Sequence, residues 1–152
     1  MLMPEQLTIT SPDSADRDAV IRLLAEQLAE HRIETGGEAI AAAVDGIMVD
    51  DRRGFLLVAK EAGTAVAVAY VSFIWTLEHG GKSCWLEELY VLPERRGVGI
   101  GSKLVAAVLE GAQSAGCAAV DLEVDSDHGR AADLYSRYDF RSLSRARWVR
   151  SL

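Results

Sequence analysis

The 152-residue sequence lacks an apolar run long enough to cross a lipid bilayer, which takes about 20 residues in a helix. Its longest apolar stretch, residues 65–75, has the length of a strand. A basic start followed by an apolar segment, the pattern of a secretory signal peptide, is also missing from the N-terminus. We therefore expect no membrane association and a cytoplasmic location.

Cysteine is scarce, and the two that occur, Cys84 and Cys117, lie far apart in apolar surroundings. This spacing indicates packed, reduced thiols rather than a disulfide framework. A disulfide or a catalytic thiol is the alternative interpretation. No cluster of cysteine and histidine has the spacing of metal ligands, so the sequence predicts no metal site.

Basic residues are outnumbered, with 16 Lys and Arg against 23 Asp and Glu, which gives a net charge of −7. This balance argues against a protein that binds the phosphate backbone of nucleic acids. It suits a cationic substrate, because an acidic cleft attracts amines, although solubility alone explains the same charge. With 49% hydrophobic and 26% charged residues, the chain is expected to form one globular domain over residues 1–152.

Residue periodicity predicts an α/β fold in which a mixed sheet carries helices on its faces. A tight turn at residues 61–63 predicts a β-hairpin, and Gly116 is placed to end a helix as a C-cap. The predicted strands are residues 6–10, 55–60, 64–75, 83–91, 118–124 and 142–149. The predicted helices run from an N-cap at Asp16 to about residue 31, over 38–45, from the loop at 93–97 to about 115, and over 129–138.

The most informative segment is residues 95–103, where Gly97, Gly99 and Gly101 alternate between a strand and an amphipathic helix. Glycine allows close approach of the backbone to a ligand, and a helix N-terminus offers unpaired N–H groups and partial positive charge. Together they predict a pyrophosphate site, to which Arg95 and Arg96 add charge. A tight strand-to-helix connection is the alternative. The Gly-Lys-Ser/Thr ending of a nucleotide P-loop is absent here. The dinucleotide-binding fingerprint requires Gly-x-Gly-x-x-Gly, whereas this segment has Gly-x-Gly-x-Gly.

Residues 96–101, Arg-Gly-Val-Gly-Ile-Gly, resemble the Gln/Arg-x-x-Gly-x-Gly/Ala motif of the GNAT N-acetyltransferases. The preceding Leu-Glu-Glu-Leu-Tyr-Val-Leu-Pro, residues 86–93, is similar to the central strand of that family. Residues 129–135, followed by Asp139 and Phe140, resemble its later helix and turn. The resemblance covers residues 85–140, and its motifs are most similar to those of the diamine (spermidine/spermine-type) acetyltransferases.

This resemblance implies a GNAT-like mixed central sheet, helices on both faces, and splayed central strands at residues 83–91 and 118–124. Acetyl-CoA is expected in the gap between these strands, with no metal. The family often has Asn near the start of the later helix; His128 stands at or near that position, which leaves Arg130 as the alternative phosphate contact. The implied cofactor-binding residues are Leu89, Tyr90, Val91, Arg96, Gly97, Val98, Gly99, Ile100, Gly101, Ser102 and Arg130.

By the same resemblance, Tyr135 is the acid that protonates the departing thiolate, and a core tyrosine on an amphipathic helix is the alternative. An amine needs a base, because at pH 7 only about one alkyl amine in a few thousand is unprotonated. Glu87 and Glu88 are the candidates. As neighbours on a strand they are expected to point to opposite faces, and the resemblance favours Glu87 as the catalytic residue, with Glu88 contacting substrate. A structural role for both is the alternative.

The acceptor site is implied near Trp75 and His31, with Glu34 and Glu38 as further candidates, and each of these side chains is otherwise an ordinary surface residue. The expected reaction is acetyl transfer to the primary amine of a small cationic molecule, by direct attack. Acetylation of a protein amine and a non-catalytic acyl-CoA-binding module are the alternatives. The resemblance leaves a homodimer open, with residues 140–152 as an interface strand.

Overall fold

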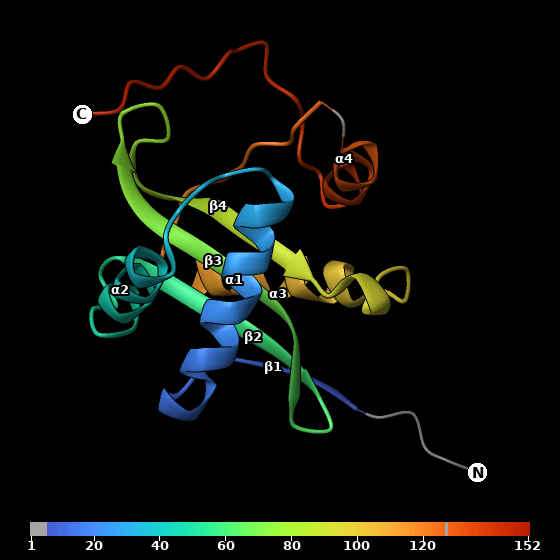
Figure 1. Ribbon diagram of the computed structural model, residues 1–152. Coiled ribbons are helices and arrows are strands. Elements are labelled where there is room, and N and C mark those ends of the chain that lie inside the picture. The colour runs from blue at the N-terminus through green and yellow to red at the C-terminus, as the bar shows by residue number, and fades with distance from the viewer. Residues whose placement is uncertain (1–5, 127) are drawn as a thin grey trace.

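A computed structural model describes residues 6–126 and 128–152 and contains a five-stranded sheet in the order β1-β2-β3-β4-β5 (Figure 1). Neighbouring strands are antiparallel except for β4 and β5, which are parallel. The strands are β1 Leu7–Thr10, β2 Gly54–Glu61, β3 Thr64–Thr76, β4 Gly81–Val91 and β5 Val120–Asp121. The α-helices are α1 Arg17–Glu30, α2 Gly37–Met48, α3 Ile100–Ser114 and α4 Gly129–Ser136, and short 3-10 turns cover Ser14–Asp16 and Pro93–Arg95.

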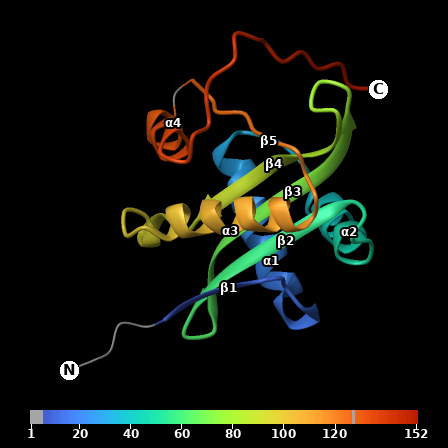
Figure 2. The same ribbon diagram turned by 180° about the vertical axis from the view of Figure 1, so that it is seen from behind.

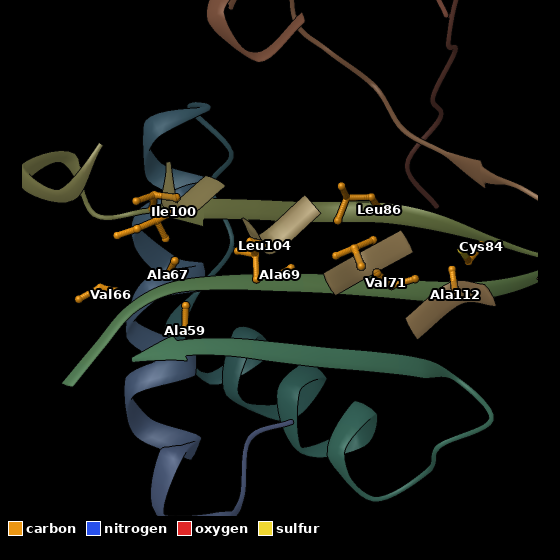
Figure 3. Packing of buried hydrophobic residues seen from close by; sticks show 12 residues of the cluster. Ala59, Val66, Ala67, Ala69, Val71, Cys84, Leu86, Ile100, Leu104 and Ala112 are labelled. Carbon is orange, nitrogen blue, oxygen red and sulfur yellow. The ribbon is translucent and has the colours of Figure 1, made fainter. Parts of the chain in front are cut away.

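The predicted α/β architecture is confirmed, with α1 and α2 on one face of the sheet and α3 on the other (Figures 1 and 2). Strand β3 is apolar throughout its central part because it is covered on both sides. Ala67 and Ala69 face α3, and Val68 between them faces α1 and α2. Figure 3 shows Leu104 of α3 over the small side chains of β2 and β3, where alanine lets the helix backbone come close to the sheet.

Local chemistry explains the turns that the sequence predicted. In the β2–β3 hairpin, Ala62 and Gly63 both have positive φ, at 48° and 79°, the combination that a two-residue type I′ turn requires. Helix α3 ends as predicted at Gly116, whose φ is 79°. There the Gly116 N–H donates to the Gln113 carbonyl and the Cys117 N–H to the Ala112 carbonyl, both at 3.0 Å, which is the Schellman pattern.

Asp16 occupies the N-cap position of α1 as predicted, but its side chain makes no capping hydrogen bond there, because Asp13 caps a 3-10 turn three residues earlier. Asp13 accepts hydrogen bonds from the N–H groups of Ala15 and Asp16, at 2.9 and 3.2 Å. The Asp16 carboxylate reaches back to the Asp13 N–H at 2.9 Å, which completes a capping box. Asp16 also pairs with Lys60 of β2, and this tertiary contact holds its side chain away from the first turn of α1.

The predicted strand at 118–124 is much shorter, and the one at 142–149 does not form in the described residues. Hydrogen-bonded pairing leaves β5 with only Val120 and Asp121, and residues 142–149 are irregular and exposed. Alternate positions in this segment read Leu143, Arg145, Arg147 and then Val149, so that face is not consistently apolar and has little surface to bury against a sheet.

Candidate active site

The site lies where the one parallel pair of strands separates. Strand β4 pairs with β5 at Cys84–Val120 and Trp85–Asp121, and β4 then continues to Val91 without a further partner on that edge among residues 6–126 and 128–152. On its other edge β4 remains paired with β3 as far as Val91. The predicted splaying of the two central strands is thus present, and Leu89 and Val91 lie on the stretch of β4 beyond the pairing.

A β-bulge in this stretch changes where the two glutamates point. Tyr70 of β3 pairs with Glu88, and the next residue, Val71, pairs with Leu86, so that Glu87 is the extra residue of the bulge. As a result Leu86 and Leu89, three positions apart, pack in the same cluster against α3. Strict alternation would have placed them on opposite faces.

Both glutamates therefore lie on the α1 side of the sheet, and the prediction that they point to opposite faces is wrong. Glu87 is exposed and accepts a hydrogen bond from Ser72 Oγ at 2.8 Å. Tyr70 packs against the α1–α2 cluster; burial raises the pKa of its phenol, and the charge of Glu87 adds to this shift. Glu88 instead meets the side chain of Gln27 on α1.

Glu88 is half-buried, and this burial is the largest cause of the raised pKa of its carboxyl group. A hydrogen bond from Gln27 and the nearby His31 oppose the shift, while the charge of Glu87 adds to it. The sequence analysis did not single out Gln27 as a site residue. The signal was present, because this polar side chain is buried on the apolar face of α1.

Tyr135 approaches the open edge of β4 from α4. It packs against the α3-side cluster and contacts the ring of Phe140 edge-on, with centroids 5.7 Å apart. Burial raises the pKa of Tyr135 to about 12, and the charge of Glu88 acts in the same direction. The phenol therefore keeps its proton at neutral pH. Tyr135 and Glu88 are 47 positions apart in the sequence, and the fold brings them close enough to interact electrostatically.

The glycine segment forms the turn into α3 that its composition predicted. Gly97 and Gly99 have φ angles of 83° and 90°, which side chains other than glycine rarely tolerate. A Cβ built on either residue meets no atom within 4 Å. The Lys103 N–H donates to the Gly99 carbonyl at 3.1 Å, and the amides of the first helical turn before it have no carbonyl within the helix to bind. This open, N–H-rich turn fits a diphosphate.

The two arginines before the glycines do not add free charge to the turn as predicted, because each pairs with a glutamate. Arg95 makes two hydrogen bonds of 2.8 Å to Glu61. Arg96 makes two bonds of 2.8 and 2.9 Å to Glu30 of α1 and donates to the Val91 carbonyl at 2.8 Å. Arg96 thus fixes the loop to β4 and α1, and any anion binding in this turn depends mainly on the backbone.

Tyr90 and Ser102 are also held by neighbouring residues. Tyr90 is buried on the α1 side, donates to Glu26 at 3.1 Å and lies under the Arg96 guanidinium. Ser102 donates to Tyr138 at 2.6 Å, and the Tyr138 hydroxyl donates to the Ser102 carbonyl at 2.8 Å. These bonds join the first turn of α3 to the end of α4.

The remaining predicted site residues lie at different distances from the opening between β4 and β5. Val98 is exposed in the turn and Arg130 in the first turn of α4. His31, at the end of α1, is near enough to Glu88 to affect its pKa. Trp75 is 79% exposed and pairs with Lys82, six positions before Glu88 and thus about 20 Å away along the strand. The structure does not bring Trp75 to the carboxylate.

The Cys84 thiol is unsuited to nucleophilic catalysis. Both cysteines are free, and burial raises the pKa of Cys84 to about 12, so its thiol stays protonated. No helix among the described residues is long and apolar enough to cross a membrane.

A mixed sheet whose parallel pair opens beside a glycine-bounded helix N-terminus is the architecture of an acyltransferase fold. Residues 18–140 match the sequence profile of the acetyltransferase (GNAT) family, and the chain belongs to this family of enzymes. The resemblance drawn from the sequence is confirmed.

Curated relatives are similar over different parts of the chain. Thialysine N-epsilon-acetyltransferase of Sus scrofa is 39% identical over 77 residues, 51% of this chain and 43% of its own length. The Mus musculus enzyme of that name is 32% identical over 81% of this chain and 75% of its own. Mycothiol acetyltransferase of Clavibacter michiganensis is 32% identical over 93% of this chain and 45% of its own length. The chain thus spans less than half the length of the pig and bacterial relatives.

Solved structures of low sequence identity share the fold. An aminoglycoside N-acetyltransferase in complex with CoA superposes with a TM-score of 0.85 at 18% identity, covering 99% of this chain and 98% of its own. A predicted acetyltransferase from Clostridium acetobutylicum with acetyl-CoA gives 0.79 at 18% identity, covering 95% and 96%.

The substitution Gly99→Val tests the anion-binding turn. We expect it to weaken acetyl-CoA binding by about tenfold or more, because a branched side chain would stand beside the N–H groups of the turn. Gly63→Val in the β2–β3 hairpin is the matched control, since Gly63 has a similar φ of 79° and equally open surroundings. Calorimetric titration should show unchanged affinity in the control. Equal affinities in both variants would contradict the assignment of the turn.

Proposed function

We propose that the protein transfers an acetyl group from acetyl-CoA to the primary amine of a small cationic molecule. The observation that carries the proposal is the placement of a half-buried carboxylate, Glu88, and a protonated phenol, Tyr135, at the opening between β4 and β5. The family match and the thialysine N-epsilon-acetyltransferase relatives support an amine acceptor. Acetyl-CoA supplies the activated thioester.

The chain's backbone is proposed to hold the cosubstrate along two segments. The N–H groups of residues 96–102 would bind the diphosphate, because the positive φ of Gly97 and Gly99 opens the turn and the start of α3 adds partial positive charge. The pantetheine arm would lie against Leu89 and Val91 on the unpaired part of β4. Since the Val91 carbonyl already accepts from Arg96, we assign the main-chain contact chiefly to Leu89.

Glu88, rather than Glu87, is proposed as the base. Removal of a proton from an alkyl ammonium is aided by a carboxylate whose pKa is raised toward neutrality, and burial raises the pKa of Glu88. Glu87 is exposed and bonded to Ser72, which suits a carboxylate that binds a cationic group. The bulge places both acids on one side of the sheet, so an amine bound by Glu87 would lie beside Glu88.

Tyr135 is proposed as the acid for the leaving group. In a direct transfer the amine nitrogen forms the new bond to the acetyl carbon as the carbon–sulfur bond breaks. Glu88 takes a proton from the ammonium before attack, directly or through water, and the Tyr135 hydroxyl gives a proton to the sulfur. The second proton that the nitrogen loses as the amide forms returns to the Tyr135 oxygen, directly or through water. A phenol whose pKa is about 12 is protonated when this step begins, and burial strengthens its bond to a developing anion.

Replacing each glutamate separately distinguishes the two proposed roles. Glu88→Gln should lower kcat by about 100-fold or more and remove the acidic limb of the pH–rate profile. In the unmodified protein this limb falls as the pH drops through the raised pKa of Glu88, because only the carboxylate accepts a proton. Glu87→Gln should raise KM for the amine and keep that limb. Steady-state kinetics of both variants between pH 5 and 9 distinguish these roles. An unchanged pH–rate profile in Glu88→Gln would remove Glu88 from the mechanism.

Tyr135→Phe should lower kcat by about tenfold or more while acetyl-CoA affinity stays the same, because only the hydroxyl is lost and the ring still packs against Phe140. Single-turnover measurements that compare Tyr135→Phe with the unmodified protein report the chemical step directly. Wild-type rates in Tyr135→Phe would leave this tyrosine with a packing role.

An amine panel, read as released CoA thiol, tests the substrate class. Thialysine, lysine, diamines, polyamines and amino sugars form one arm, and peptides with a free N-terminus or lysine form the other. We expect turnover in the first arm, highest for acceptors that carry a second cationic group for Glu87. Turnover of peptides alone would support a protein acetyltransferase instead. Cosubstrate binding with no turnover of any amine would indicate a non-catalytic acyl-CoA-binding module.

A further inference from the structure

Three side chains with metal-ligating atoms meet between the end of α1 and the segment that leads into α4. His31 Nδ1 lies 2.9 Å from Asp125 Oδ2, and His128 Nδ1 lies 3.7 Å from the same oxygen. The two imidazole rings are in edge-on contact with centroids 4.8 Å apart. His31 and Asp125 are 94 positions apart in the sequence, which explains why no ligand spacing was visible there. Figures 1 and 2 both show the end of α1 beside α4.

The geometry of these atoms is close to that of a transition-metal site. One ligand atom from each residue can be chosen so that all three lie within 4.8 Å of one another. Two ligands of a tetrahedral zinc ion are about 3.3 Å apart, because each lies 2.0–2.2 Å from the metal. Small rotamer adjustments that lengthen the 2.9 Å contact and shorten the longer ones would therefore let the three side chains share one ion.

The chemistry of the set selects the kind of ion. Two imidazoles and one carboxylate suit zinc and its neighbours in the first transition row, whereas magnesium and calcium prefer oxygen ligands. The side chains are partly exposed, with exposed fractions of 26% for His31, 38% for His128 and 61% for Asp125, while His128 Nδ1 itself is buried. An ion can therefore reach the site by small side-chain movements, without unfolding. Three protein ligands leave a fourth position for water.

We propose that His31, Asp125 and His128 form a binding site for zinc or a similar divalent transition-metal ion. An ion bound here links the end of α1 to the segment before α4. It also lies near the opening, since His31 already affects the pKa of Glu88. The bound ion stabilises the fold by linkage. This inference rests on the cluster itself and not on the proposed acetyl transfer.

Calorimetric titration of the whole chain with zinc chloride tests the site. We expect one zinc ion per chain and a higher thermal midpoint in its presence, with no such effect from magnesium chloride. His31→Gln, Asp125→Asn and His128→Gln should each weaken binding by about tenfold or more. His79→Gln is the control, because His79 is the one histidine of the sequence outside the cluster, where it bonds to Asp121. Thermal midpoints without metal establish that each variant is folded.

Cobalt separates this site from binding at a thiol. Cobalt(II) bound by nitrogen and oxygen shows visible bands without an intense sulfur-to-metal band in the near ultraviolet, whereas coordination by Cys117 or Cys84 produces one. The proposal predicts the first spectrum, with Cys117→Ser unchanged. A sulfur band, zinc affinity lost in Cys117→Ser, or wild-type affinity in both His31→Gln and His128→Gln would overturn it.

Discussion

The structure depends on a parallel pairing that lasts for only two residue pairs. Cys84 and Trp85 of β4 hold Val120 and Asp121 of β5, and the strands then separate. This short contact joins the segment after α3 to the sheet, and the separation leaves backbone groups of β4 without a strand to satisfy them. Buried peptide groups are costly when unpaired, so the opening is a place where an extended ligand can replace the missing strand. The same separation gives Tyr135 of α4 access to the β4 edge.

The bulge at Glu87 adds the second constraint. A regular strand would send neighbouring carboxylates to opposite faces, and only one of them would then face an amine beside α1. With the extra residue, Glu87 and Glu88 share a face but not an environment, because one is exposed beside Ser72 and the other is half-buried beside Gln27. Like charges at close range raise the pKa of the more buried acid. Two adjacent residues of the same type are thereby suited to different tasks.

Sequence reasoning succeeded where local chemistry determines the structure and failed where a distant partner does. The turn at Gly99 and the helix end at Gly116 follow from residues within one turn, and both were predicted. The bulge at Glu87 depends on how β4 pairs with β3, which no local pattern reports. Arg96 looks in sequence like charge for a phosphate, yet Glu30 of α1 pairs with it. The site's composition was thus largely predictable, and the direction of its side chains was not.

Charged groups differ between the two ends of the opening between β4 and β5. At the α3 end, the arginines are paired with glutamates, so the attraction for an anion comes from fixed backbone N–H groups that need no reorganisation. At the other end lie Glu87 and Glu88, and Arg147 of the C-terminal segment pairs with Glu123. This hydrogen bond is the main cause of the raised pKa of Arg147, and the charge of Glu87 adds to it. A guanidinium therefore already lies where a cationic acceptor would be attracted. Since the exposed pair with Glu123 is weak, the ammonium of the proposed acceptor would compete with Arg147 for these carboxylates. The acidity of the surface would then become specific only beside Glu88, the proposed base, which is half-buried.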